Sequence, residues 1–231
     1  MRKRALLVSA VALIAVLVAG GLFASNMGFK LNYSMERSAA ATADGASRTG
    51  LQWVALPYNQ QTNLINANDL ILDIGGTSII AQVAQYVRSG DIPAAYTGLT
   101  GSAFTLTPGD AYYIGLQATA LPSPYSYIVV GSHNPGLGIN MLAQSVGVSR
   151  TGQNLWSYPY HSTAANAKQI IDELNAFGGA GTVNAIARYG QSGDIPVAYT
   201  GLTGTAFSML PGDGYLVQVN ANVTGWVPSH Y

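Results

Sequence analysis

The chain of 231 residues has no cysteine, few charged side chains and only three histidines. Without cysteine it cannot form a disulfide, a thiolate nucleophile or a cysteine-ligated metal centre. Charged residues make up 9% of the chain, against roughly 25% in an average soluble domain. The histidines, His133, His161 and His230, lack the His-x-x-x-His spacing of a zinc-binding helix, so we expect no metal centre of that kind.

The common catalytic and cofactor motifs are also missing. There is no Gly-x-Ser-x-Gly elbow and no glycine-rich loop carrying a lysine for phosphate. No basic stripe is present that could neutralise nucleic-acid phosphates. We therefore predict that the protein is not an enzyme, holds no cofactor and binds no nucleic acid.

The N-terminus has the pattern of a secretory signal peptide. Arg2, Lys3 and Arg4 precede an uncharged apolar run over 5–24, which is rich in small residues towards its end. We expect cleavage near Gly21 or Ala24, with residues 1–24 removed and the protein secreted or placed on the cell surface. The alternative is a retained membrane anchor, since the run is nearly long enough to span a bilayer. In either case the protein meets the membrane only through this segment.

The rest of the chain is an internal repeat. Residues 89–114 and 192–217 are identical at 18 of 26 positions, at a spacing of 103 residues. The match extends outward, pairing Trp53 with Trp156 and the Pro-Tyr pair 57–58 with 159–160. Residues 26–32 likewise resemble 134–140. The sequence thus predicts two units, 25–132 and 133–231.

The pattern within each unit is mainly β with one short helix, an α+β fold of two tandem units. In unit 1 a strand over 28–35 and a polar linker over 37–50 precede a body over 51–132. Helices are expected at 68–74 and, capped by Asn166 and ended by Gly178, in the second unit. Phe177 is expected on the apolar face of that helix. Further strands are expected near 79–88, 94–98, 103–107 and 111–118 and at their counterparts.

The last strand of each unit shows which side faces inward. Tyr112, Ile114 and Leu116 alternate with more polar positions, and only this set stays apolar in the second copy. The tripeptides Pro-Gly-Asp at 108–110 and 211–213 precede these strands as turns.

These motifs resemble those of a broad group of uncharacterised exported repeat proteins of environmental bacteria and archaea. The shared pattern is Trp-x-x-x-Pro-Tyr, a helix, then Leu-x-Pro-Gly-Asp-x-Tyr, after a mature start like Ser25–Phe29. The resemblance implies an extracellular β-domain and carries no activity, because its motifs are turns and core aromatics.

Four aspartates are the main candidates for a polar site: Asp91, Asp110, Asp194 and Asp213. Carboxylates in loops can bind calcium or, held in pairs, cleave glycosidic bonds. All four lie in turn sequences, where aspartate bonds backbone amides two residues on. We favour the turn role, with calcium as the weaker alternative.

Tyrosine offers a second kind of site. Tyr96, Tyr113 and Tyr199 are candidates to face outward and stack on a sugar or other ligand. Packing between strands would use the same rings. These residues define the alternative function, an extracellular glycan- or ligand-binding module.

The N-terminal strand suggests self-assembly. Its apolar side chains, Phe29, Leu31, Tyr33 and Met35, alternate with polar ones. Either it folds into its own unit, or residues 137–141 complete unit 1 and leave this strand to enter a neighbouring molecule. We expect a structural protein, a filament or matrix subunit whose partner is itself or an extracellular polymer.

Overall fold

The computed structural model describes residues 28–37, 51–60, 64–85, 94–119, 124–144, 152–188 and 197–230. The predicted signal segment, Asp91, Asp194 and linker residues 38–50 lie outside this part of the chain. Within it, no helix is long and apolar enough to cross a membrane.

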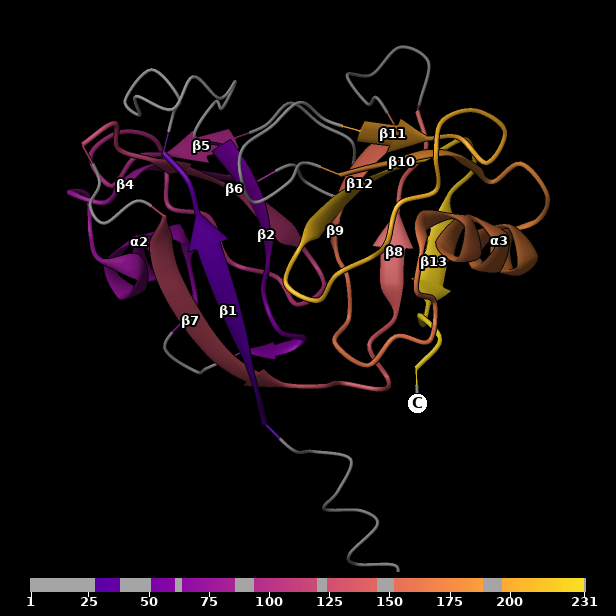
Figure 1. Ribbon diagram of the computed structural model, residues 1–231, viewed down its shortest axis with the longest axis horizontal. Coiled ribbons are helices and arrows are strands. Elements are labelled where there is room, and N and C mark those ends of the chain that lie inside the picture. Colours follow the sequence, from indigo (N-terminus) through magenta and orange to yellow (C-terminus); the bar gives the residue numbers. More distant parts are fainter. Residues whose placement is uncertain are drawn as a thin grey trace, which may run out of the picture.

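Two similar β-rich units lie side by side, as the repeat predicts (Figure 1). Unit 1 has an antiparallel sheet in the order β2-β6-β4-β5, a second sheet in the order β1-β7-β3, and the helix α2. Its strands and helix are β1 (Phe29–Met35), β2 (Leu51–Ala55), β3 (Asn59–Gln60), α2 (Ala67–Ile74), β4 (Ile80–Gln85), β5 (Ala94–Tyr96), β6 (Ala111–Leu116) and β7 (Tyr125–Ser132).

Unit 2 repeats this plan with a sheet in the order β11-β10-β12-β9, the strand pair β13-β8 and the helix α3. Its elements are β8 (Ile139–Met141), β9 (Gln153–Ser157), α3 (Ala167–Gly178), β10 (Val183–Arg188), β11 (Val197–Tyr199), β12 (Gly214–Val219) and β13 (Val223–Trp226). The mainly β, two-unit fold class is confirmed.

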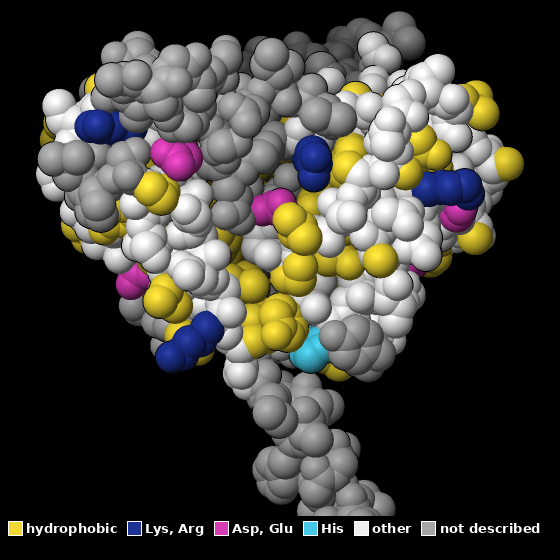
Figure 2. Space-filling view, viewed as in Figure 1, with side chains coloured by type: hydrophobic (Ala, Val, Ile, Leu, Met, Phe, Trp, Pro, Cys, Tyr) yellow, Lys and Arg dark blue, Asp and Glu magenta, His cyan; other side chains and the backbone are white. Residues whose placement is uncertain are grey.

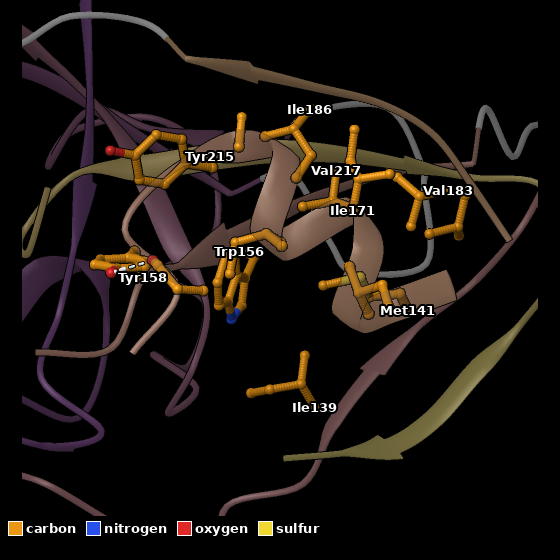
Figure 3. Close-up of a cluster of buried hydrophobic side chains, with 14 of the residues drawn as sticks. Ile139, Met141, Trp156, Tyr158, Ile171, Val183, Ile186, Tyr215 and Val217 are labelled. Atoms are coloured by element: carbon orange, nitrogen blue, oxygen red, sulfur yellow. Dashed lines mark hydrogen bonds between the residues drawn. The ribbon is translucent and has the colours of Figure 1, made fainter. Parts of the chain in front are cut away.

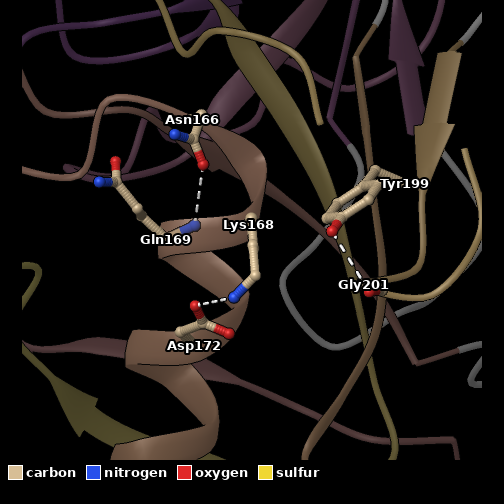
Figure 4. Close-up of polar contacts among 6 residues, drawn as sticks. All are labelled: Asn166, Lys168, Gln169, Asp172, Tyr199 and Gly201. Atoms are coloured by element: carbon tan, nitrogen blue, oxygen red, sulfur yellow. Dashed lines mark hydrogen bonds and ion pairs between the residues drawn. The ribbon is translucent and has the colours of Figure 1, made fainter. Parts of the chain in front are cut away.

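Both helices begin at an asparagine cap. Asn66 Oδ1 accepts hydrogen bonds from Asn68 N and Asp69 N, and Asn166 Oδ1 accepts one from Gln169 N (Figure 4). These bonds satisfy amides that the first helical turn leaves without partners. The α3 helix has 12 residues against 8 in α2. Phe177 lies in its last turn and is 52% exposed, so its predicted place in the core is wrong.

The predicted strands at 103–107 and its counterpart are irregular segments instead. Their backbone hydrogen bonds are made to the residues around the start of each helix. Ala67 N donates to Phe104 O and Leu106 N to Ile65 O, and Ala167 N donates to Phe207 O. The pairing is therefore limited to single bridges, Asn66 with Thr105 and Asn166 with Ser208.

Each unit has its own core, and the predicted inward face is confirmed. Tyr112, Ile114 and Leu116 of β6 are buried with α2 and β1. In unit 2, Trp156, Tyr215 and Val217 meet side chains of α3 and β8 (Figure 3).

The predicted equivalence of Trp53 and Trp156 is wrong. Trp53 lies opposite Tyr113 on β6, whereas Trp156 lies opposite Tyr215 on β12. Val54, opposite Tyr112, is therefore the counterpart of Trp156. A one-residue difference in register turns a side chain to the other face of a sheet. Both tryptophans are buried, but Trp156 is in the core of unit 2 and Trp53 is between the units.

The contact between the units, here called the seam, buries Trp53, Ala55, Ala111 and Leu155. Its hydrogen bonds are reciprocal. Ala55 N donates to Gly212 O (2.8 Å), and its counterpart Ser157 N donates to Gly109 O (3.0 Å). Each unit thus presents the same patch to the other, the arrangement found in two-fold symmetric dimers.

Candidate assembly site at the N-terminal strand

The β1 strand lies at the edge of its sheet and pairs antiparallel with β7 over its whole length, from Phe29 opposite Gly131 to Met35 opposite Tyr125. Leu31, Tyr33 and Met35 are buried, while Lys30, Asn32 and Ser34 are exposed. The alternation predicted from the sequence therefore sets which face of β1 enters the core.

Tyr33 is the central anchor of β1. It is fully buried, stacks on Tyr127 of β7 and donates a hydrogen bond from its hydroxyl to Ala55 O. Burial, followed by the nearby Tyr127 and Asp213, raises the pKa of Tyr33 well above its usual value. The neutral hydroxyl therefore persists at any physiological pH and keeps its bond to β2.

A buried amide ties the end of β1 to the larger sheet. Glu36 N donates to Gln52 Oε1 (2.8 Å), and Gln52 Nε2 donates to Glu36 O (3.1 Å). In unit 2, Asn154 forms the same pair of bonds with Leu142. Because Glu36 and Leu142 make matching bonds, Met35 of unit 1 and Met141 of unit 2 occupy equivalent positions. The sequence match of 26–32 with 134–140 would instead make Met141 the counterpart of Tyr33.

The same strand also contacts unit 2. The Phe29 ring stacks on Tyr160, with centroids 4.3 Å apart. Gly212, in the Pro-Gly-Asp turn of unit 2, lies so close to Tyr33 that a Cβ there would be 3.1 Å from the ring. The β1 strand therefore closes unit 1 and also covers one end of the seam.

The three histidines gather beside Phe29, although they are far apart in the sequence and lack the spacing of metal ligands. The His133 ring is 5.3 Å from that of His161 and 4.9 Å from that of His230, and the His161 ring meets Phe29 edge-on at 6.3 Å. A water-sized hollow between β1 and the two Pro-Tyr pairs includes His133 in its wall. Figure 2 shows a histidine next to hydrophobic side chains at the lower edge of this face.

The pairing of the N-terminal strands is settled within the chain. β1 pairs with β7 of unit 1, and β8 pairs with β13 of unit 2. The arrangement in which residues 137–141 complete unit 1 is wrong, because β8 is buried in the core of its own unit. Each unit of a single chain is closed by its own first strand.

Two of the four candidate aspartates, Asp110 and Asp213, lie in the described part of the chain, and both are at the seam. Asp110 forms a bridge with Trp156, and Asp213 forms one with Val54. Their backbone amides donate hydrogen bonds to carbonyls of the turn, Asp110 N to Thr107 O and Asp213 N to Leu210 O. Among the described residues, no group of three or more His, Asp or Glu side chains is arranged to hold a metal.

The candidate stacking tyrosines are largely engaged in packing. Tyr199 is only 7% exposed, so its expected outward position is wrong, and its hydroxyl donates to Gly201 O (Figure 4). Tyr96 is half-buried and donates to Asn68 Oδ1. Tyr113, also half-buried, packs edge-on against Trp53 at the seam. Their role in ligand stacking stays a prediction.

No protein-family model, curated protein or solved structure matches the chain.

Proposed function

We propose that this is an exported structural protein of the cell surface or extracellular space, and that its copies assemble by exchanging β1. The observation that carries the proposal is the position of β1. It is an edge strand whose buried face closes unit 1 and whose first residue contacts unit 2. A strand from another copy would find every one of these contacts.

Length and energy are compatible with exchange. Residues 36–50 join β1 to β2, and a linker of that length can span roughly 50 Å when extended. Burial of Leu31, Tyr33 and Met35 contributes about 5–9 kcal/mol. Because closed and exchanged forms bury the same side chains, the net preference between them is small, and protein concentration decides it. Release of β1 from a closed molecule is slow, because it exposes these three buried side chains.

Each molecule donates one β1 and accepts one. Donation along successive copies is head-to-tail and builds an open chain, whereas reciprocal donation between two copies closes a dimer. Removal of residues 1–24 during export would limit assembly to the outside of the membrane.

A glycan-binding module has weaker support. The hydroxyls of Tyr96 and Tyr199 already donate to protein acceptors, and the Tyr113 ring is packed at the seam. Stacking platforms present an open aromatic face instead.

The absence of cysteine permits a clean test. Ser34 on β1 lies directly opposite Ser126 on β7, and both side chains are exposed. Facing positions on antiparallel strands are close enough for a disulfide. The variants Ser34→Cys and Ser126→Cys are prepared separately, from Ser25 onward, and are mixed and refolded together under oxidising conditions.

Exchange predicts disulfide-linked heterodimers in the mixture, and ladders of higher mass from the double variant. The control replaces Ser126→Cys with Ser78→Cys, an exposed position that is not paired with β1. The proposal fails if the mixture stays monomeric while the double variant forms only the bond within one chain.

A further inference from the structure

We propose that the histidine cluster, His133, His161 and His230, is a proton-operated latch that holds β1 closed at neutral pH and loosens it in acid. This inference rests on the proposed strand exchange and adds its regulation. It concerns the end of β1 at Phe29, where the strand, the seam and the last residues of the fold meet.

The cluster collects every histidine of the chain from three separate segments. His133 follows β7, His161 follows β9, and His230 forms a bridge with Ser162. His133 lies between the other two and is only 7% exposed. Its Nε2 atom has no hydrogen-bonding partner within the described residues. A buried imidazole in this position is favoured in its neutral form.

Among the described residues around His133 and His230, little negative charge is available to stabilise an imidazolium. Aromatic neighbours are Tyr58, whose ring lies over His133 at 6.3 Å, and Tyr160, which meets His161 at 4.8 Å. On β1, Lys30 is exposed. On α3, the Glu173 carboxylate accepts hydrogen bonds from Trp226 Nε1, Ser229 N and Ser229 Oγ. Between described residues, no carboxylate forms an ion pair with His133 or His230.

The direction of the pH effect follows from these contacts. Burial, then His230 and His161, lowers the pKa of His133. The closed state therefore binds a proton less readily than an open state in which the imidazole is in water. Its stability is complete above the ordinary histidine pKa of about 6.5 and declines as the pH falls below that value.

Contacts between rings pass this effect to β1. The His161 ring touches both Phe29 and Tyr160, which are stacked on each other. Two imidazolium ions about 5 Å apart repel, and separating the rings removes support from the Phe29–Tyr160 stack. The β8 strand provides an internal control, because it is buried among the apolar side chains of unit 2.

Hydrogen exchange of β1 amides against pH, corrected for the intrinsic rate, tests the latch in the chain from Ser25 onward. Between pH 6.5 and 5.5 we expect opening of β1 to increase up to about tenfold for each proton gained. Exchange of β8 should change much less. His133→Gln keeps a polar side chain without a titrating group and should flatten the response of β1, with protection of β8 confirming that the variant folds.

Three results would overturn the latch. The first is an equal pH dependence of hydrogen exchange in β1 and β8. The second is an unchanged pH response of β1 both in His133→Gln and in the double variant His161→Gln/His230→Gln, and the third is strong protection of β1 by Zn²⁺ at pH 7.5 that depends on His133. The last would indicate a metal site. Mixing of the Ser34→Cys and Ser126→Cys variants at a fixed pH of 7.5 tests strand exchange separately. If the mixed variants form no linked dimers, strand exchange is wrong, and the pH response of β1 still tests the latch independently.

Discussion

The two units share one plan but differ where tryptophan enters the large sheet. Trp156 of unit 2 points into its own core, next to Trp226, with ring centroids 5.2 Å apart. Trp53 of unit 1 points the other way, into the seam. Val54 and Trp156 occupy equivalent core positions, opposite Tyr112 and Tyr215. Tryptophan at nearly equivalent places in the two repeats thus stabilises the core of unit 2 through Trp156 and the contact between the units through Trp53.

A second difference lies at the centre of the seam. Ala111 and Gly214 are equivalent residues, and a Cβ on Gly214 would lie 2.7 Å from the Ala111 Cβ. The two-fold arrangement of the units brings residue 111 against its counterpart, residue 214, and there is no room for a methyl group on both. The two copies therefore differ here, with alanine in unit 1 and glycine in unit 2.

The largest expected effect comes from Trp156→Ala. This change leaves a cavity in the core of unit 2 and removes the donor to the Tyr58 hydroxyl, so we expect a loss of about 3–5 kcal/mol in the free energy of unfolding. Hydrogen exchange should show β10 and β12 weakened more than β4 and β6. The control Trp53→Ala should affect both units, because it acts at the seam. Equal effects of the two changes on unit 2 alone would contradict the assignment.

Asn154→Ala and Gln52→Ala compare the two amide bridges. Asn154 bonds Leu142 N and O and also donates to Gly152 O and Val217 O, while Gln52 bonds only Glu36 among the contacts described. We expect a loss of about 2–4 kcal/mol for Asn154→Ala and about half of that for Gln52→Ala. Urea unfolding measures both. A larger loss from Gln52→Ala would reverse the comparison.

Gly214→Ala tests the centre of the seam. The added methyl meets Ala111 and Trp53, so we expect a loss of about 1–3 kcal/mol. The exchanged pair Ala111→Gly/Gly214→Ala restores a single methyl group and should recover most of that loss. Thermal unfolding of the single and double variants gives the coupling directly. Additive effects would show that the two positions do not share space.

The smallest effect is expected where the units agree most closely. Thr97 and Thr200 make matching turns, in which the hydroxyl oxygen accepts a bond from Thr100 N or Thr203 N at 2.9 Å. Thr97→Val and Thr200→Val should each cost about 0.5–1 kcal/mol, because these are exposed, local bonds. Melting temperatures should fall by similar amounts. A clear inequality would reveal a difference between the loops that the structure does not contain.

Part of the fold could be predicted from the sequence because it depends on local chemistry. The Asn166 cap, the inward face of Tyr112, Ile114 and Leu116, and the alternation along β1 each follow from the spacing of residues within one element. The alignment of the two copies around the Pro-Gly-Asp turns also follows, since 18 of 26 positions are identical there.

The register of β2 and β9 could not be predicted in this way. Matching Trp53 with Trp156 gave the best agreement of residue types, but the Pro-Tyr pairs at 57–58 and 159–160 are spaced one residue closer. That single residue decides which face each tryptophan occupies. The burial of Tyr199 could not be predicted for a related reason, because it depends on packing in the core with α3, which is distant in sequence.

By itself, the sequence determined two β-rich units, the Asn166 helix cap and the buried faces of β1 and β6, since these depend on short-range periodicity. The tertiary structure alone decided that β1 closes its own unit, that the units meet through equivalent patches, and that three histidines far apart in the chain become neighbours. These features arise from contacts between distant segments, whose partners are set by packing of the whole chain rather than by any local pattern.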